Sequence, residues 1–215
     1  KPCDLMADIG TDHAYLPIYL IKNGIIKQAV AADISRGSCD KAERNIRANH
    51  LENYIEVRCG NGLKVMGQEE IPDTIVIAGM GGMLAINVLN SHKCGSSTQR
   101  LILQVQRDIY AVRKHLHAKG YRIEDENIIK EDGKVYTAMA AVKGDEAPYT
   151  EAEYYFGRLL LAKKNPVLKE YIAFENNKIK NVLASLKDKH SEEIEIRKAQ
   201  LKWLNNIQKE ALKCL

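Results

Sequence analysis

The chain has 215 residues, of which 45% are hydrophobic and 28% are charged, the mixture of an ordinary globular protein. This length accommodates one α/β domain with a smaller addition, and no apolar run approaches the ~20 residues that cross a bilayer. The net charge of +4 lies in the last third, because residues 1–149 carry 19 basic and 19 acidic side chains and residues 150–215 carry 13 and 9. A basic face there fits a phosphate-rich partner, although a solvated helix surface has the same composition.

The cysteines are few and scattered, and none forms a C-x-x-C pair. They are Cys3, Cys39, Cys59, Cys94 and Cys214. This pattern predicts reduced thiols in a cytoplasmic protein, with no disulfide framework, and no cluster of side chains has the spacing of a metal site. The chain begins at Lys1 and enters a predicted strand almost at once, so we expect natural residues upstream.

Short apolar runs alternate with amphipathic stretches as far as about residue 120, which is typical of βαβ units. The predicted strands are Cys3–Ile9, Gln28–Ile34, Ile55–Cys59, Thr74–Ala78 and Leu101–Val105. The predicted helices between and after them are Tyr15–Asn23, Ser38–His50, Met83–Ser91 and Ile109–Lys119. Several of the strands are nearly continuous apolar runs, as strands buried on both faces are, so a parallel sheet is expected.

The pattern changes after this point. Tyr121–Lys130 and Lys134–Val142 flank an Asp-Gly turn and predict a hairpin. Five parallel strands followed by an antiparallel pair is the layout of the Rossmann-like methyltransferases. Pro166–Lys189 and Ser191–Leu215 then show apolar positions at helical spacing, which predicts an antiparallel pair of helices that resembles a short coiled coil.

These elements predict an α/β chain of two domains. Residues 1–149 form a Rossmann-like domain of the class I S-adenosylmethionine-dependent methyltransferase type. Residues 150–215 form a C-terminal helical, coiled-coil-like arm. The basic excess of the arm makes it the candidate for contact with a nucleic acid.

Acidic residues close the first two predicted strands. Asp8 stands in the run Ala7-Asp8-Ile9-Gly10, and Asp33 follows the second strand. In a parallel sheet both lie at the carboxyl edge, where such folds bind ligands. Gly10 allows close approach of the backbone, Asp33 suits a ribose diol, and Asp8 suits a cationic amino group. The alternatives are an ordinary turn residue for Asp8 and the N-cap of the next helix for Asp33.

The glycine pattern decides between cofactors. A dinucleotide site needs G-x-G-x-x-G for the pyrophosphate, and here only Gly10 is present. A cofactor with a ribose, a positive centre and no pyrophosphate fits better, and S-adenosylmethionine is such a cofactor. A nicotinamide enzyme is correspondingly disfavoured.

Two further turns follow the third and fourth predicted strands. Gly60-Asn61-Gly62 can serve the adenine of the cofactor, or it is a plain Asn-Gly turn. Ile77-Ala78-Gly79-Met80-Gly81-Gly82 lacks the Asn/Asp-Pro-Pro-aromatic turn of enzymes that methylate exocyclic amines. Its three glycines allow a flat base to approach the backbone, whereas tight strand-to-helix packing accounts for only one of them. We assign Ala78 and Gly79 to the cofactor, and Met80, Gly81 and Gly82 to the substrate.

Four runs of the chain resemble the bacterial tRNA (adenine-22-N1)-methyltransferase family, TrmK. They are Ala7-Asp8-Ile9-Gly10-Thr11-Asp12-His13-Ala14-Tyr15-Leu16-Pro17, Ile77-Ala78-Gly79-Met80-Gly81-Gly82, Arg100-Leu101-Ile102-Leu103-Gln104 and Glu131-Asp132-Gly133-Lys134-Val135-Tyr136. The first two are specific in combination and the others support them. Many members have Pro-Asn after the glutamine of the third run, where this chain has Val105-Gln106. The helical arm fits the coiled-coil arm of the family.

The resemblance implies methyl transfer from S-adenosylmethionine to N1 of an adenine in tRNA, at position 22. Because N1 carries a neutral lone pair, the reaction needs no prior deprotonation, and positive charge moves onto the purine. A nearby carboxylate would stabilise that charge, and Asp12 is our candidate catalytic residue. The alternative role for Asp12 is capping of the following helix.

The remaining site predictions concern side chains around this loop. His13 and Ile34 are assigned to the cofactor, although His13 is equally suited to fixing the loop by hydrogen bonds. Tyr15 and Tyr136 are candidate stacking platforms for a base that is turned out of its helix. For both tyrosines a place in the core is the alternative.

The sequence therefore predicts a cytoplasmic enzyme with tRNA as its partner and with neither a metal ion nor a membrane anchor. It does not fix the oligomeric state, and a monomer is the working expectation. Two other functions stay open. One is a methyltransferase of a small molecule or protein, in which the arm would serve dimerisation. The other is a non-catalytic RNA-binding protein on the same fold.

Overall fold

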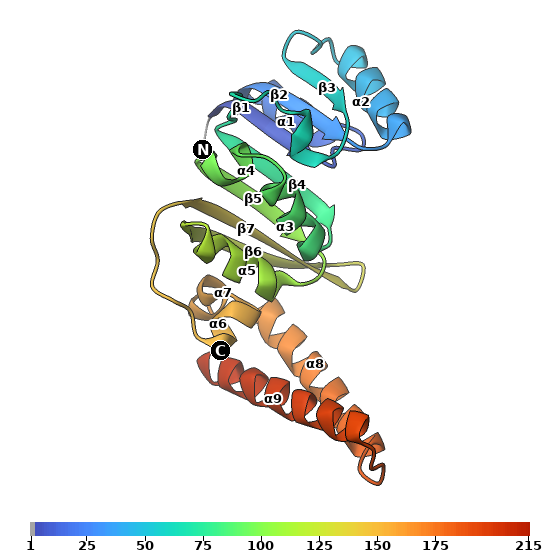
Figure 1. The fold of residues 1–215 in the computed structure, drawn as a ribbon, viewed down its shortest axis with the longest axis vertical. Helices are drawn as coiled ribbons and strands as arrows, with labels where there is room; N and C mark the ends of the chain where they lie inside the picture. The colour runs from blue at the N-terminus through green and yellow to red at the C-terminus, as the bar shows by residue number, and fades with distance from the viewer. Residues whose placement is uncertain (1–2) are drawn as a thin grey trace. The chain divides into compact units, whose positions relative to one another are not determined.

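The computed structural model describes residues 3–215 (Figure 1). Two compact units divide the chain. The first comprises the described residues up to Asp125 together with Ala138–Glu146, and the second comprises Glu126–Thr137 and Ala147–Leu215. The division passes through the predicted hairpin, whose tip belongs to the second unit.

The strands form one seven-stranded sheet with the order β3-β2-β1-β4-β5-β7-β6. Their bounds are Cys3–Ile9 (β1), Ile26–Asp33 (β2), Ile55–Cys59 (β3), Thr74–Met80 (β4), Arg100–Val105 (β5), Tyr121–Glu131 (β6) and Lys134–Lys143 (β7). β1 pairs in parallel with β2 and β4, β2 with β3, and β4 with β5. The predicted α/β class and Rossmann-like sheet are confirmed. The strand order reverses between β1 and β4, which is the point where such sheets bind ligands.

The helices of the first unit connect these strands (Figure 1). They are α1 (Tyr15–Lys22), α2 (Arg36–Ala48), the 3₁₀ helix η1 (Gly62–Val65), α3 (Gly82–Asn90), α4 (Cys94–Ser97) and α5 (Ile109–Ala118). The longer elements of this unit lie within two residues of their predicted bounds. The one-turn helices η1 and α4 were not predicted, because a single turn is too short to show an amphipathic repeat.

One apolar cluster packs α1 and α2 against the same face of the sheet. Ile18 of α1 and Ile46 of α2 join buried side chains of the strands, among them Met6 and Ala29. This packing places the loop that follows β1 next to the start of α2. The two loops that follow Asp8 and Asp33 are thereby fixed by one core.

The second unit consists of the hairpin tip and four helices. They are α6 (Glu151–Phe156), α7 (Arg158–Ala162), α8 (Pro166–Ser185) and α9 (Glu192–Cys214), and α8 packs against α9. Its apolar core contains Phe156, Leu160, Ile172 and Ile207 from the helices and Ile128 from the hairpin. The C-terminal helical region is confirmed, although α8 ends at Ser185, four residues before the predicted end at Lys189. The hairpin tip joins this unit because these helices cover its apolar side chains.

A buried amide cluster lies between α8 and α9. Asn176 Nδ2 donates to Asn205 Oδ1 at 2.7 Å and to Gln208 Oε1 at 3.1 Å. A polar side chain in an apolar helical seam loses its partners when the two helices slide past one another. We infer that this cluster fixes the pairing register of the two helices.

Within residues 3–215, the structure bears on membrane-spanning helices, metal-binding groups and disulfides. No helix within residues 3–215 is long and apolar enough to cross a membrane. The same residues contain no group of three or more histidine, cysteine, aspartate or glutamate side chains arranged to bind a metal ion. All five cysteines are free thiols.

Candidate active site

The ends of the central strands bring the predicted site segments together. Ile9 of β1 pairs with Ala32 of β2 on one side and with Ile77 of β4 on the other. The carboxylates of Asp8 and Asp33 and the glycine turn after Ile77 therefore meet at one edge of the sheet, beside the point of strand reversal. In the next pair of strands, Asp33 is opposite Cys59, so the Gly60–Gly62 turn follows at the same edge.

Asp8 is a buried carboxylate, with only 5% of its surface exposed. Its pKa is raised to about 6, chiefly by burial; a 2.6 Å hydrogen bond from Thr11 Oγ1 opposes this effect, and the nearby Asp33 carboxylate adds to it. A carboxylate in such a place is stabilised by any cation that comes next to it. Asp8 therefore fits the ammonium group of S-adenosylmethionine.

The pKa of Asp8 gives a test by pH. Protonation below about pH 6 removes the charge that would bind an ammonium group, so the affinity for S-adenosylmethionine should fall about tenfold between pH 7 and pH 5. The free energy of unfolding of the ligand-free protein should instead rise as the pH falls over this range. Since the pKa in the folded state exceeds the ordinary value, the penalty for the ionised form is present above about pH 6 and disappears as the pH falls toward 4.

Calorimetric titration across this pH range measures the affinity, and thermal unfolding measures the stability. Asp8→Asn is the matched control, because it removes the titrating group and keeps the shape. It should bind S-adenosylmethionine weakly at every pH. An equal fall of affinity with pH in this variant would assign the titration to another group.

Asp33 is anchored by two backbone amides. Its Oδ1 accepts from the N–H of Ser35 at 2.8 Å, and its Oδ2 accepts from the N–H of Asp12 at 3.2 Å. The N-cap of α2 is Ser35, whose side chain accepts from Ser38 N–H, so Asp33 is not the cap. A carboxylate has about four acceptor positions, and those that the amides leave are available to a ribose diol.

Ile34 and Asn61 lie beside Asp33 at the same edge of the sheet. Ile34 is apolar but 71% exposed, which is suited to the face of an adenine ring. Asn61 is exposed and begins η1 without a hydrogen bond from its side chain, so its amide is available to a ligand. Gly60 has a packing explanation, because a Cβ there would lie 2.6 Å from Val65 Cγ1. Gly62 has a left-handed φ of +55°.

Gly10 and Gly79 adopt backbone conformations that favour glycine. Their φ angles are +83° and +78°. A Cβ on Gly10 would approach Met80 Cε at 3.1 Å, whereas a Cβ on Gly79 would meet nothing within 4 Å. Gly10 thus lies against the end of β4, and Gly79 borders open space, as the wall of a binding site does.

Gln104 was missed as a site residue in the sequence. Gly79 is an extra residue in β4, since Ala78 pairs with Gln104 and Met80 with Val105. The Oε1 of Gln104 accepts from the N–H of this bulged glycine at 3.0 Å. Its buried Nε2 has no hydrogen-bond partner in the described part of the chain. Gln104 therefore fixes the glycine turn, and only its pairing across the bulge reveals this.

The carboxylate of Asp12 lies at the rim of the site and is half exposed. Its Oδ1 accepts from Ser38 Oγ at 3.1 Å and from Lys41 Nζ at 3.4 Å, and its Oδ2 lies 3.4 Å from His13 Nε2. Desolvation alone would raise its pKa, but the Ser38 hydrogen bond and the charges of His13 and Lys41 lower it overall. The N-cap of α1 is Ala14, so Asp12 does not cap that helix. Asp12 is therefore an ionised carboxylate that links its loop to α2 and caps neither α1 nor α2.

The aromatic predictions divide between the two units. Tyr15 stacks on His13 with ring centroids 4.9 Å apart and planes 5° from parallel, and it is exposed beside Asp12. The backbone oxygen of His13 accepts from Asn45 Nδ2 at 2.9 Å, which joins the loop to α2. Tyr136 is half-buried and belongs to the second unit.

The start of α3 completes the glycine turn. Gly82 is buried, and a Cβ there would lie 2.6 Å from the backbone oxygen of Arg107. Packing therefore explains this glycine, as the sequence alternative allowed for one of the three. Met83 and Leu84 follow it with about half of their surfaces exposed, 52% and 55%. These apolar side chains were missed, because their helical spacing does not show which face is covered.

The order of the last two strands distinguishes this sheet from a dinucleotide-binding one, since β7 lies beside β5 and β6 is at the edge. With two acidic strand ends and a single glycine in the first loop, this topology defines a class I S-adenosylmethionine-dependent methyltransferase. A family model for tRNA (adenine(22)-N(1))-methyltransferases matches residues 6–210. The chain belongs to this family, and it is a tRNA (adenine-N1)-methyltransferase.

Individual relatives agree with this assignment. The tRNA (adenine(22)-N(1))-methyltransferase of Bacillus subtilis is 39% identical over 169 residues, which are 76% of this chain and 71% of the relative. The crystal structure of the B. subtilis enzyme TrmK superposes with a TM-score of 0.90 at 32% identity, over 97% and 92% of the two chains. The structure of M. capricolum TrmK in complex with S-adenosylhomocysteine superposes with a TM-score of 0.88 at 26% identity, over 98% of this chain and 92% of that one.

Proposed function

We propose that this chain transfers the methyl group of S-adenosylmethionine to N1 of adenine 22 in tRNA at the edge of the sheet described above, with Asp12 beside the reacting base. The observation that carries the proposal is the ionised, solvent-facing carboxylate of Asp12, on the loop that follows the buried Asp8 and whose backbone N–H donates to Asp33. The sequence and fold of the family support it over the whole chain.

The residues present fit the cofactor. S-adenosylmethionine supplies a methyl group on a positively charged sulfur. Asp8 would bind its amino group and Asp33 its ribose hydroxyls, while Ile34 and Asn61 would contact the adenine. Gly10, Gly60 and Gly62 would shape the loops, Ala78 and Gly79 would form the wall, and His13 would fix the loop that carries Asp12.

The target base would lie between this wall and Asp12. Met80 and Gly81 would line its pocket, Tyr15 would stack on it from the rim, and Gly82 would fix the turn through its packing. Tyr136 remains a proposed contact from the hairpin. Positive charge develops on the purine as N1 is methylated, and the Asp12 carboxylate stabilises it without reorganisation. Its lowered pKa suits this electrostatic role better than that of a strong base.

The function is tested by incubating the protein with bulk unmodified tRNA and a labelled methyl donor, followed by nucleoside analysis. The proposal expects label in 1-methyladenosine, and a tRNA with adenine 22 replaced should not be labelled. Absence of label in tRNA would favour a small-molecule or protein substrate. Absence of cofactor binding in calorimetry would favour a non-catalytic RNA-binding protein.

We further propose a functional division at residue 149, with a catalytic domain at 1–149 and a tRNA-contacting arm at 150–215. The enzyme would act as a monomer in the cytoplasm. The support for the arm is its charge, because it holds the whole basic excess of the chain. On α9, three exposed lysines lie seven and four residues apart and therefore on one side of the helix. They are Lys202, Lys209 and Lys213.

Replacing these three lysines together by glutamine should weaken tRNA binding and flatten its salt dependence. Each phosphate contact contributes roughly 0.9 to the slope of log K against log salt, so a loss of about 2 to 3 is expected if all three bind phosphates. Filter binding at several salt concentrations measures the slope. Affinity for S-adenosylmethionine should be unchanged.

The matched control is Lys27→Gln, because Lys27 is an exposed lysine of the first unit that already pairs with Asp4 at 2.9 Å. It should leave tRNA binding unaltered. Substitution is preferable to deletion of the arm, because deletion would uncover Ile128 of the hairpin. An unchanged slope in the triple variant would remove this side of α9 from the proposed interface.

A further inference from the structure

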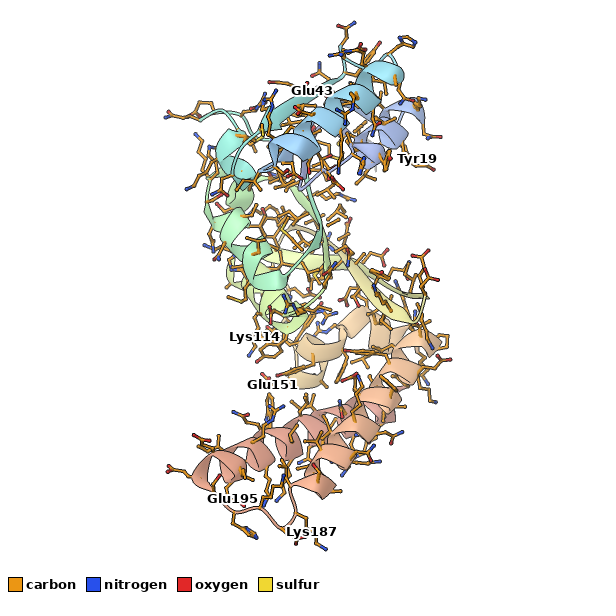
Figure 2. The ribbon with its side chains drawn as sticks, turned by 90° about the vertical axis from the view of Figure 1, so that its right-hand side faces the viewer. Tyr19, Glu43, Lys114, Glu151, Lys187 and Glu195 are labelled. Atoms are coloured by element: carbon orange, nitrogen blue, oxygen red, sulfur yellow. The ribbon has the colours of Figure 1, made fainter. Side chains whose placement is uncertain are left out.

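Two large aromatic side chains are exposed on α1, directly after the loop that carries Asp12. Tyr15 is 65% exposed and Tyr19 is 60% exposed. They are four residues apart, so they are neighbours on one side of the helix. Tyr19 lies on the outer side of α1 (Figure 2). Together with the His13–Tyr15 stack, they form a row of rings that leads away from the site.

The two helices that form this surface, α1 and α2, carry an excess of basic side chains. α1 and α2 together contain five lysines and arginines against two acidic residues, although residues 1–149 as a whole are balanced. Lys22 of α1 donates a hydrogen bond to Asn49 at the end of α2, and Lys41 of α2 pairs with Asp12 in the loop before α1. Both cations therefore lie along the boundary between the two helices. Arg44 is exposed, follows Lys41 by three residues and makes no ion pair with any described side chain.

We propose that this α1–α2 surface, made of Tyr15, Tyr19, Lys22, Lys41 and Arg44, binds unpaired nucleotides of the tRNA next to the target adenine. The inference rests on the proposed function and extends it to the RNA outside the pocket. Tyrosine rings would stack on bases, and the cations would pair with the phosphates between them.

The combination of groups selects this partner. A base that is turned out for methylation leaves its neighbours without a stacking partner, and an exposed ring one turn along the helix from the rim can replace it. Exposed rings on α1 and an exposed arginine on the neighbouring α2, without an ion pair within residues 3–215, suit the bases and the phosphates of a single strand. The charge excess of α1 and α2 supplies the complementarity that an anionic strand requires.

The first test separates stacking from apolar packing. Tyr19→Leu should weaken binding of unmodified tRNA at least roughly fivefold, whereas Tyr19→Phe, which keeps the ring, should bind as the wild type does. Affinity for S-adenosylmethionine should be unchanged in both. Tyr54→Leu is the matched control, because Tyr54 is 50% exposed in the same unit but precedes β3, at the opposite edge of the sheet.

The second test concerns charge. Arg44→Gln should lower the slope of log K against log salt by about 1, as the loss of one phosphate contact does. If both variants bind tRNA with unchanged affinity and slope while the wild type methylates tRNA, the surface proposal is wrong and the proposed function stands. If the wild type does not methylate tRNA, both are wrong.

Two further outcomes would also overturn the surface proposal. If Tyr54→Leu weakened tRNA binding as much as Tyr19→Leu does, the effect would not be specific to the α1–α2 surface. Equal loss of S-adenosylmethionine binding in Tyr19→Leu would assign Tyr19 to the cofactor loop. Ultraviolet crosslinking of the wild-type complex provides an independent readout, in which Tyr15 or Tyr19 should be joined to RNA.

Discussion

Replacement of Asp12 by alanine should lower the rate of methyl transfer roughly 100-fold, with a much smaller effect on affinity for S-adenosylmethionine. The loss follows from the charge that appears on the purine, because the variant has no ionised group beside it. Asp12 contacts Ser38, Lys41 and His13 through its carboxylate, but it caps no helix, so folding should be preserved. Single-turnover methylation of saturating unmodified tRNA measures the rate, and calorimetry measures the affinity.

Asp12→Asn separates charge from shape. It keeps an acceptor for Ser38 but removes the negative charge, so it should be nearly as slow as the alanine variant. Asp40→Ala is the control, because Asp40 is a carboxylate of α2 that pairs with Arg36. A rate in Asp12→Ala equal to that of the wild type would exclude Asp12 from the mechanism.

Replacement of Asp33 by alanine should weaken S-adenosylmethionine binding roughly 100-fold. Two ribose hydroxyls would donate to one ionised carboxylate, and hydrogen bonds to a charged group contribute about 1.5–3 kcal/mol each, part of which water restores. The variant also releases the amides of Ser35 and Asp12, so the loop that carries Asp12 should lose order. Calorimetry with S-adenosylmethionine measures the first effect, and the methylation rate measures the second.

Asp33→Asn removes the charge and keeps one of the two acceptors. Its amide oxygen can still accept from the N–H of Ser35, but its Nδ2 is a donor and cannot accept from the N–H of Asp12 or from a ribose hydroxyl. Intermediate affinity is therefore expected. Wild-type affinity in the alanine variant would contradict the ribose assignment, whatever happens to the rate.

The sequence was most informative where burial and turn chemistry act locally. Strands such as β1 and β4 are mostly apolar because both faces of their central parts are covered, and this pattern predicted their bounds to within two residues. The Asp132-Gly133 turn predicted the hairpin, and both residues adopt positive φ. The strand-end position of Asp8 and Asp33 followed from parallel topology alone.

Other features depend on contacts between distant residues. Ser38 and Lys41 position Asp12 across 26 and 29 residues of sequence, and Gln104 reaches Gly79 across 25. No local pattern specifies such pairs. The sequence placed the hairpin tip with the first domain, because the alternation of its apolar residues does not show which unit covers them. In the structure, Ile128 of the tip packs among the helices of the second unit.

The carboxylates of Asp8 and Asp33 have a consequence for regulation. On the proposed assignment they bind the amino group and the ribose, and methyl transfer changes neither. S-adenosylhomocysteine would therefore retain both contacts and compete with fresh donor, losing only the attraction due to the sulfonium charge. The rate of methyl transfer would then follow the ratio of donor to spent cofactor.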